Sequence, residues 1–300
     1  MGDRLHYFED LERALESSDP RLAELVCAYA EQPDPPNGVP EDHDPQKPAP
    51  RPPSDAWNLQ KVRTALGKWS LYGKTDEQKK AIRQNAWRQL EDIDHPPPRL
   101  RLGPFVLGLD DRAEAGDAYA RAQLLQIVRD VRISWGIWRG LKKLYKRSEA
   151  RFDAELFGLF AWRFDQIYQT KQTNEVGGAT YAYLRRRAWR FLRHLGASVP
   201  EAYPNYAVQV MRHYRGNNLW GTWVLPQIWT HEDLKYVTSS WITKPPQDLS
   251  RRAFDEAWKI TPEPLLRLLE DGQQDEVLDF AIRSLQQDFP EELRAPDVAW

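Results

Sequence analysis

The residues of this chain whose types and spacing suit chemistry are basic and aromatic. They gather at 180–196, TYAYLRRRAWRFLRHLG, where five arginines and a histidine are interleaved with aromatic rings. Guanidinium groups bind carboxylates and phosphates, and aromatic faces stack on nucleobases. The stretch therefore indicates either a surface for an anionic partner or a helix whose solvated side is basic.

Helical spacing separates this stretch into two faces. When the residues are placed on a helix at about 100° per residue, six apolar or aromatic residues fall on one side, which is expected to face the core. They are Tyr181, Leu184, Ala188, Phe191, Leu192 and Leu195. The opposite side carries Arg186, Arg190 and Arg193, with Arg187 and His194 beside them. Most of the basic run is therefore expected to face solvent.

Arg185 is the exception, because it projects just past Leu192 at the margin of the apolar arc. A guanidinium buried there needs a carboxylate or carbonyl partner, since an unpaired buried charge destabilises the fold. Asp165, on the preceding predicted helix, is the expected partner. We predict a structural ion pair between Arg185 and Asp165.

A second basic segment precedes the first. LKKLYKRSEAR, at 141–151, places Lys142, Lys143, Lys146 and Arg147 three or four residues apart on one side of a helix. Together with Arg186, Arg190 and Arg193 these residues define a predicted basic ridge at 142–193. Three interpretations stay open: a solvated charged ridge, a surface that contacts nucleic acid, and a docking site for an acidic segment of a partner or of this chain.

The charge distribution sets the ridge in context. Residues 121–215 carry 18 Lys and Arg against 7 Asp and Glu, whereas residues 1–60 carry 5 against 13 and residues 216–300 carry 8 against 15. The basic middle is thus flanked by acidic ends, although the net charge is only -2. This uneven charge distribution fits a basic patch that binds acidic partners. It equally fits a fold in which the acidic terminal regions pack against the basic central region.

No catalytic or metal-binding signature is present. The six histidines show no metal-ligand spacing, and the sequence lacks HExxH, the Walker A motif, G-x-S-x-G and G-x-G-x-x-G. Cys27, the single cysteine, is interpreted as a core thiol. Gly136 and Gly140, in GIWRG, favour close helix packing or a kink over a phosphate cradle. We therefore expect no cofactor and no metal, and we favour a non-enzymatic protein.

Apolar periodicity predicts a mostly α protein built as a helical array, a HEAT-like α-solenoid. We expect an N-terminal helical segment at 1–31, a Pro-rich disordered linker at 32–55, and the array at 56–300 with an irregular Trp-rich part at 216–247. Thr75 and Gln78 predict a capping box. Residues 96–111 are expected to form an irregular connection with a short strand, and 112–147 one long helix. Further helices are expected near 152–170, 180–195, 200–214, 250–259, 262–271 and 273–288.

Composition places the chain among soluble proteins. Apolar residues make up 41% and charged residues 29%, and no run approaches the roughly 18 apolar residues of a membrane span. The N-terminus lacks a basic region followed by an apolar one. With one cysteine, the expected location is the reducing cytoplasm, with no membrane contact. The last residues, APDVAW, suggest the front part of a longer protein.

The stretch from ISWGIWRGLKKLYKRSEARFDAELFGLFAWRFD through TYAYLRRRAWRFLRHLGASVPEAYPNYAVQVMRHY resembles uncharacterised bacterial helical proteins of the HEAT-like kind. The resemblance covers roughly residues 120–290. Members of that group often neighbour WGR domains, but this chain contains only WRG at 138–140 and WGT at 220–222. The resemblance implies an architecture and carries over no catalytic residues.

These observations favour a non-enzymatic interaction scaffold or adaptor, with a protein partner, in a bacterial cytoplasmic system. The alternative is a nucleic-acid-binding module that uses the basic ridge at 142–193. A third interpretation, an enzyme with an unfamiliar site in the Trp-rich part at 216–247, has no recognisable motif behind it.

Overall fold

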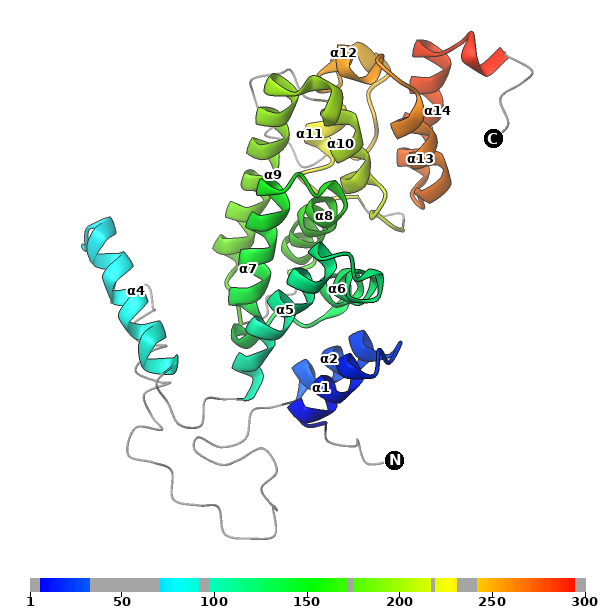
Figure 1. Cartoon of the computed structure of the whole chain (residues 1–300). Coiled ribbons are helices and arrows are strands. Elements are labelled where there is room, and N and C mark those ends of the chain that lie inside the picture. Colours follow the sequence, from blue (N-terminus) through cyan, green and yellow to red (C-terminus); the bar gives the residue numbers. More distant parts are fainter. Residues whose placement is uncertain are drawn as a thin grey trace, which may run out of the picture. The chain divides into compact units, whose positions relative to one another are not determined.

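Helices form nearly all of the regular structure in the computed structural model, which describes residues 6–32, 71–91, 98–171, 175–216, 219–230 and 242–294. The described residues contain thirteen α-helices and four 3₁₀ helices (Figure 1). Within these ranges the β structure is a single isolated bridge between Arg215 and Gln273. The prediction of a mostly α protein is confirmed.

The chain divides into two compact units, and the division falls inside α6 and α7. Unit 1 comprises residues 1–127 and 134–140, and unit 2 comprises residues 128–133 and 141–300. Unit 1 contains α1 (Phe8–Glu16), α2 (Leu22–Glu31), α4 (Asp76–Glu91), η1 (Pro98–Arg101), α5 (Leu102–Glu114), most of α6 (Ala118–Asp130) and the start of α7 (Trp135–Ala150). The expected linker at 32–55 lies outside the described residues except for Gln32.

The two N-terminal helices pack against α5 and α6. The Phe8 ring lies edge-on to Phe105, with ring centroids 5.7 Å apart. The Gln123 side chain accepts a hydrogen bond from the Ala23 amide (2.8 Å), and Tyr119 donates its hydroxyl hydrogen to the Asp19 carbonyl oxygen (2.7 Å). Residues 6–31 of the expected N-terminal segment therefore share unit 1 with residues 98–127.

Residues 96–111 differ from the sequence-based expectation. From Pro98 onward they are helical, as η1 and α5, because Gly103 serves close packing and does not break the chain. A Cβ on Gly140 would lie 2.5 Å from the Gly103 carbonyl oxygen, so the starts of α5 and α7 touch through backbone. The glycines of GIWRG therefore allow close helix packing, as predicted.

The single long helix expected at 112–147 is also wrong. Gly116, at φ 96°, ends the α5 segment, and the Asp117 carboxylate accepts from the Ala120 amide (3.0 Å) to begin α6. A second break lies at 131–134, before α7.

The predicted capping box is confirmed before α4: the Thr75 amide donates to Gln78 Oε1 (3.0 Å), and the Gln78 amide donates to Thr75 Oγ1 (3.3 Å).

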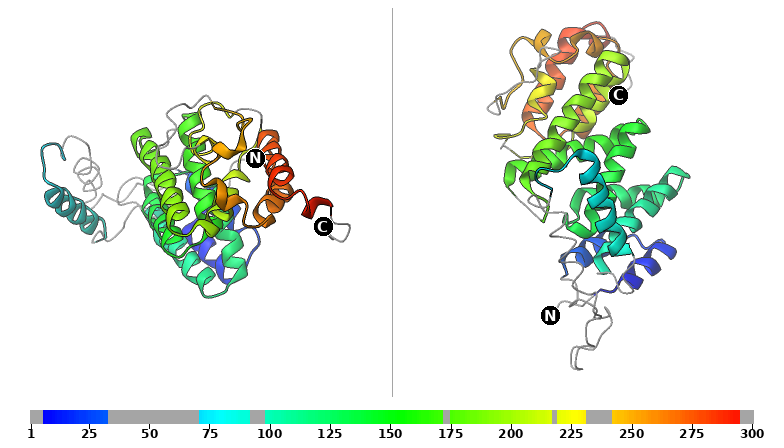
Figure 2. Two further views of the ribbon diagram at one scale, coloured as in Figure 1. Left: turned by 90° about the horizontal axis from the view of Figure 1, so that it is seen from above. Right: turned by 90° about the vertical axis from the view of Figure 1, so that its left-hand side faces the viewer.

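Unit 2 is built around α8 (Ala154–Thr170), which packs against α9 (Gly178–Ser198) and α10 (Tyr203–Met211) (Figures 1 and 2). Aromatic rings fill this core, and Phe157 lies 4.6 Å from Phe191 between ring centroids. A Cβ on Gly158 would lie 2.4 Å from the backbone of Gln209, so α8 and α10 approach closely. The remaining elements are η2 (Pro200–Ala202), α11 (Pro226–Trp229), η3 (Leu249–Arg251), α12 (Asp255–Trp258), α13 (Glu263–Asp271), α14 (Asp275–Asp288) and η4 (Glu292–Arg294).

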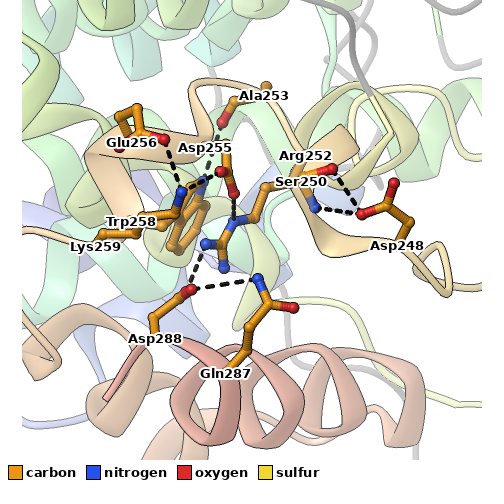
Figure 3. Close-up of polar contacts among 10 residues, drawn as sticks. All are labelled: Asp248, Ser250, Arg252, Ala253, Asp255, Glu256, Trp258, Lys259, Gln287 and Asp288. Atoms are coloured by element: carbon orange, nitrogen blue, oxygen red, sulfur yellow. Dashed lines mark hydrogen bonds and ion pairs between the residues drawn. The ribbon is translucent and has the colours of Figure 1, made fainter.

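A buried arginine ties the segment before α12 to α14 (Figure 3). The Arg252 side chain is fully buried, and its Nε donates to Asp255 Oδ1 (2.8 Å) while its Nη2 binds Asp288. Lys259 adds a partly exposed bond to Asp255 (2.6 Å). Because both carboxylates face one guanidinium, the two acidic residues compensate a charge that burial would otherwise penalise.

Candidate interaction surface

Helix α9 divides into a buried and an exposed side much as its periodicity predicts. Tyr181, Leu184, Ala188, Leu192 and Leu195 are buried, while Phe191 is half-buried. Opposite them, Arg186 and Arg190 are exposed, and Arg193 is half-buried. The helix ends at Ser198, because Val199 leaves the helical conformation (φ -141°, ψ 66°) before Pro200. The apolar stripe thus fixes the direction in which the arginines point.

Arg187 lies on the flank of α9 that meets α7. Its Nε donates to Glu149 Oε1 (2.8 Å), and its Nη2 binds the other carboxylate oxygen. Burial raises the pKa of Glu149, and the neighbouring Arg187, Lys146 and Arg190 oppose that shift. The sequence reasoning placed Arg187 beside the solvated face and missed Glu149. The signal available was that Glu149 is the only carboxylate on α7.

The four basic residues predicted on α7 occupy two sides of its exposed surface. Lys142, Lys143 and Lys146 are exposed and Arg147 is half-buried. Lys142, Lys146 and Glu149 follow one another at intervals of four and three residues, so the two lysines share the edge of α7 that faces α9. Lys143 and Arg147 lie further around the helix. The structure therefore brings Lys142 and Lys146 toward the arginines of α9.

Arg185 and Asp165 are brought together, as the sequence paired them. Arg185 Nη1 lies 3.0 Å from Asp165 Oδ1, and the Arg185 side chain is 11% exposed. The fully buried Asp165 carboxylate also accepts from the Tyr214 hydroxyl (2.7 Å) and from the amides of Trp223 (2.9 Å) and Val224 (3.0 Å). Asp165 therefore holds the loop 219–224 against α8 and α9.

Aromatic rings surround this ion pair. The Arg185 guanidinium carbon lies 3.8 Å above the Tyr168 ring centroid, and Gln169 donates its side-chain amide to the Trp220 carbonyl oxygen. On α9, Arg190 lies over Tyr183 (5.3 Å) and Arg193 over Trp189 (5.4 Å). The name α7–α9 surface is used below for residues 142–147 of α7, the exposed residues 183, 186 and 190 of α9, and the half-buried residue 193 of α9.

The chain matches no protein-family model, and comparisons with curated proteins and with solved structures give no match either. The resemblance to HEAT-like bacterial proteins accordingly remains an expectation from the sequence.

The electrostatics of the α7–α9 surface are one-sided. Residues 141–150 and 178–198 contain nine Lys and Arg and one carboxylate, Glu149. Among the described residues no carboxylate lies within ion-pair distance of Arg186 or Arg190. The acidic C-terminal region instead meets the basic middle at α10, where Arg212 binds Asp271 (3.2 Å). The exposed cations of α9 are therefore left for solvent or a partner.

His213, just after α10, is a buried histidine of unit 2. It lies beside Trp162, and burial, together with Arg212, Arg129 and Arg215, lowers its pKa to about 3. It is therefore neutral at physiological pH. No group of three or more His, Cys, Asp or Glu side chains in the described ranges could hold a metal ion. None of the described helices combines the length and the apolar composition that a bilayer span requires.

Proposed function

We propose that this protein is a non-enzymatic interaction scaffold, a HEAT-like helical array of a bacterial cytoplasmic system, that docks a polyanionic partner on its α7–α9 surface. The observation that carries the proposal is the nine-to-one excess of cations over carboxylates on two adjacent helices. The one carboxylate, Glu149, is already held by Arg187. An acidic partner would therefore meet a large excess of positive charge on these two helices.

Physical chemistry favours a partner over a purely solvated ridge. Like charges at helical spacing repel each other and destabilise the folded state slightly. Arg190 on α9 and Lys146 on α7 both lie near Glu149, which Arg187 already binds, and Arg186 is exposed on the same side of α9 as Arg190. A potential of one sign over a surface accelerates the approach of an oppositely charged partner and selects against basic ones.

Packed helix pairs support the scaffold interpretation. Helices α13 and α14 pack against each other and are joined at 272–274, and α8 and α9 form a second packed pair. Arrays of such pairs offer extended surfaces on which partners dock. Nucleic acid is the second candidate for the polyanion, and the exposed aromatic rings beside the arginines are the observation that favours it.

The proposal is tested with a fourfold variant that removes exposed cations, Lys142→Gln, Lys143→Gln, Arg186→Gln and Arg190→Gln. A matched control removes four exposed cations outside the surface, Arg251→Gln, Lys259→Gln, Arg267→Gln and Arg294→Gln, with the same change in net charge. Binding of fluorescent polyglutamate and of an oligothymidylate is measured by anisotropy at about 50 mM salt, where electrostatic binding is strong.

We expect the wild type and the control variant to bind at least one probe and the fourfold variant to lose that binding by at least tenfold. The proposal fails when neither probe binds the wild type, or when the control variant loses as much affinity as the fourfold variant. Equal unfolding temperatures of the two variants ensure that lost binding is not lost folding.

A further inference from the structure

We infer that the polyanion docked on the α7–α9 surface is single-stranded nucleic acid, an inference that rests on the proposed function and specifies its partner. The additional observation is the position of the exposed aromatic side chains. In the described part of unit 2 four aromatic residues are exposed: Phe152 (62%), Tyr168 (40%), Tyr183 (46%) and Trp220 (57%). The exposed large apolar side chains of the acidic C-terminal helices are aliphatic, namely Ile260, Ile282 and Leu293.

The rings border the basic helix. Tyr183 lies on α9 itself, beneath the Arg190 guanidinium. Tyr168 ends α8 and is covered on one face by Arg185, which comes from α9. Trp220 is linked to the same place, because Gln169, the neighbour of Tyr168, binds the Trp220 carbonyl oxygen. Two exposed rings therefore lie against arginines of α9, and the Trp220 backbone lies next to one of these rings in contact with Gln169.

Trp220 is presented by a loop with a fixed backbone. Three residues further on, the Trp223 and Val224 amides are bound by the buried Asp165 carboxylate. Gly221 adopts φ 83°, a left-handed conformation that glycine reaches without strain. Trp220 is nevertheless 57% exposed. Because the backbone beside it is already ordered, stacking of a planar ligand on its side chain costs less ordering entropy than on a flexible loop.

The chemistry of the partner follows from the exposed aromatic rings and the cations taken together. Exposed rings stack on nucleobases of any sequence, whereas a duplex hides the base faces and offers only phosphates to the cations. An acidic protein segment supplies carboxylates but no regular series of planar rings. From Tyr183 to Arg193 the helix rises roughly 15 Å, which is about four phosphates at the spacing of a stacked strand. The arginine row therefore matches a short strand whose bases reach Tyr168 and Trp220.

The test compares an oligothymidylate and an oligouridylate, each of about 12 nucleotides, with a duplex of equal length and with polyglutamate. A leucine variant, Tyr168→Leu with Trp220→Leu, removes both rings. A phenylalanine variant, Tyr168→Phe with Trp220→Phe, keeps an aromatic ring at each position and serves as the matched control. Both positions are exposed, so both variants should fold, and circular dichroism melts check this.

We expect either single strand to bind at least tenfold more tightly than the duplex. Removing both rings should weaken single-strand binding by about tenfold to a hundredfold, while the phenylalanine variant stays within a few-fold of the wild type. Polyglutamate binding should not respond to ring removal. Binding of one single strand and not the other supports the inference and identifies the nucleic acid as DNA or RNA.

Equal affinities for duplex and single strand, or an unweakened leucine variant, would overturn the inference. Those results leave the proposed function standing as long as the fourfold cation variant still loses binding. Preference for polyglutamate over both single strands likewise overturns the inference and points to an acidic protein segment. When the fourfold variant binds every probe like the wild type, both the inference and the proposed function fall.

Discussion

Replacing Asp165 should destabilise the fold more than replacing its partner Arg185, because the Asp165 carboxylate makes more of the hydrogen bonds. Asp165→Asn leaves the largely buried Arg185 without a counter-ion, and its new amide group faces the Trp223 and Val224 amides, which are themselves donors. Loss of one partner of a buried pair costs about 3–5 kcal/mol. Arg185→Ala should cost less, about 2–3 kcal/mol, because Asp165 keeps three uncharged donors. Arg190→Ala, on the exposed side, should change stability by under about 0.5 kcal/mol.

Urea unfolding of the full chain, followed by tryptophan fluorescence and circular dichroism, measures these differences. Hydrogen exchange with mass spectrometry adds a local measurement, since peptides covering 219–230 should lose amide protection in Asp165→Asn and keep it in Arg190→Ala. Equal small effects of Arg185→Ala and Arg190→Ala would show that the ion pair contributes nothing. Unchanged protection of 219–230 in Asp165→Asn would refute the anchoring role of the carboxylate.

Four further changes test other parts of the structure. The pKa of His213, about 3 when folded, lies below its ordinary value of 6.5, so the unfolded chain binds more protons between these values. Wild-type stability should therefore fall with decreasing pH below 6.5, relative to His213→Gln, by up to about 1.4 kcal/mol per pH unit, and parallel pH profiles would count against this. Phe152→Gly should raise the midpoint of thermal unfolding, because Phe152 is exposed and at φ 56°; a lower midpoint would indicate packing of the ring. Gly158→Ala should destabilise through contact with α10, whereas Gly108→Ala, with no atom within 4 Å of its Cβ, should stabilise by about 1 kcal/mol, as urea midpoints would show. Arg252→Ala should destabilise by about 3–5 kcal/mol, and a change under 1 kcal/mol in the same assay would contradict the ion cluster.

Local periodicity was enough to predict parts of the site. The stripe through Tyr181 and Leu195 determined which arginines are exposed, and the angle of Arg185 predicted its burial and its partner Asp165. These inferences need only the helical repeat, because the core lies on one side of α9. The helix boundary at Gly116 and Asp117 was missed, although a glycine followed by an aspartate is typical of a helix end and a new start.

Long-range packing was not predictable from the same patterns. Residues 96–111 were expected to be irregular, but Gly103 lies in a helix and admits Gly140, 37 residues later in the chain, and no local rule identifies that neighbour. The pairing of Arg187 with Glu149 required knowing which helix lies beside α9. The amides of Trp223 and Val224 carry no side-chain signal at all, so the anchoring of their loop by Asp165 could only be found in the structure.

The α7–α9 surface is a weaker polyanion site than its arginine count suggests. Arg185 and Arg187 are both occupied by carboxylates of the chain. The cations that remain for a partner are the exposed Arg186 and Arg190 of α9 and the exposed Lys143 and Lys146 of α7, with Arg193 partly shared with the Trp189 ring. Binding should therefore be moderate at physiological salt and strong only at low salt.

The measurement that tests the central claim most directly is the salt dependence of binding to the α7–α9 surface. Affinity of the full chain for an oligonucleotide is recorded over a series of salt concentrations for the wild type, the fourfold variant and its matched control. The logarithm of the affinity falls with the logarithm of the salt concentration, and each neutralised phosphate of a single strand makes this fall steeper by about 0.7. Removing Lys142, Lys143, Arg186 and Arg190 should make the fall shallower by up to about 3, while the control keeps the wild-type slope. A fourfold variant with the wild-type slope would contradict the account.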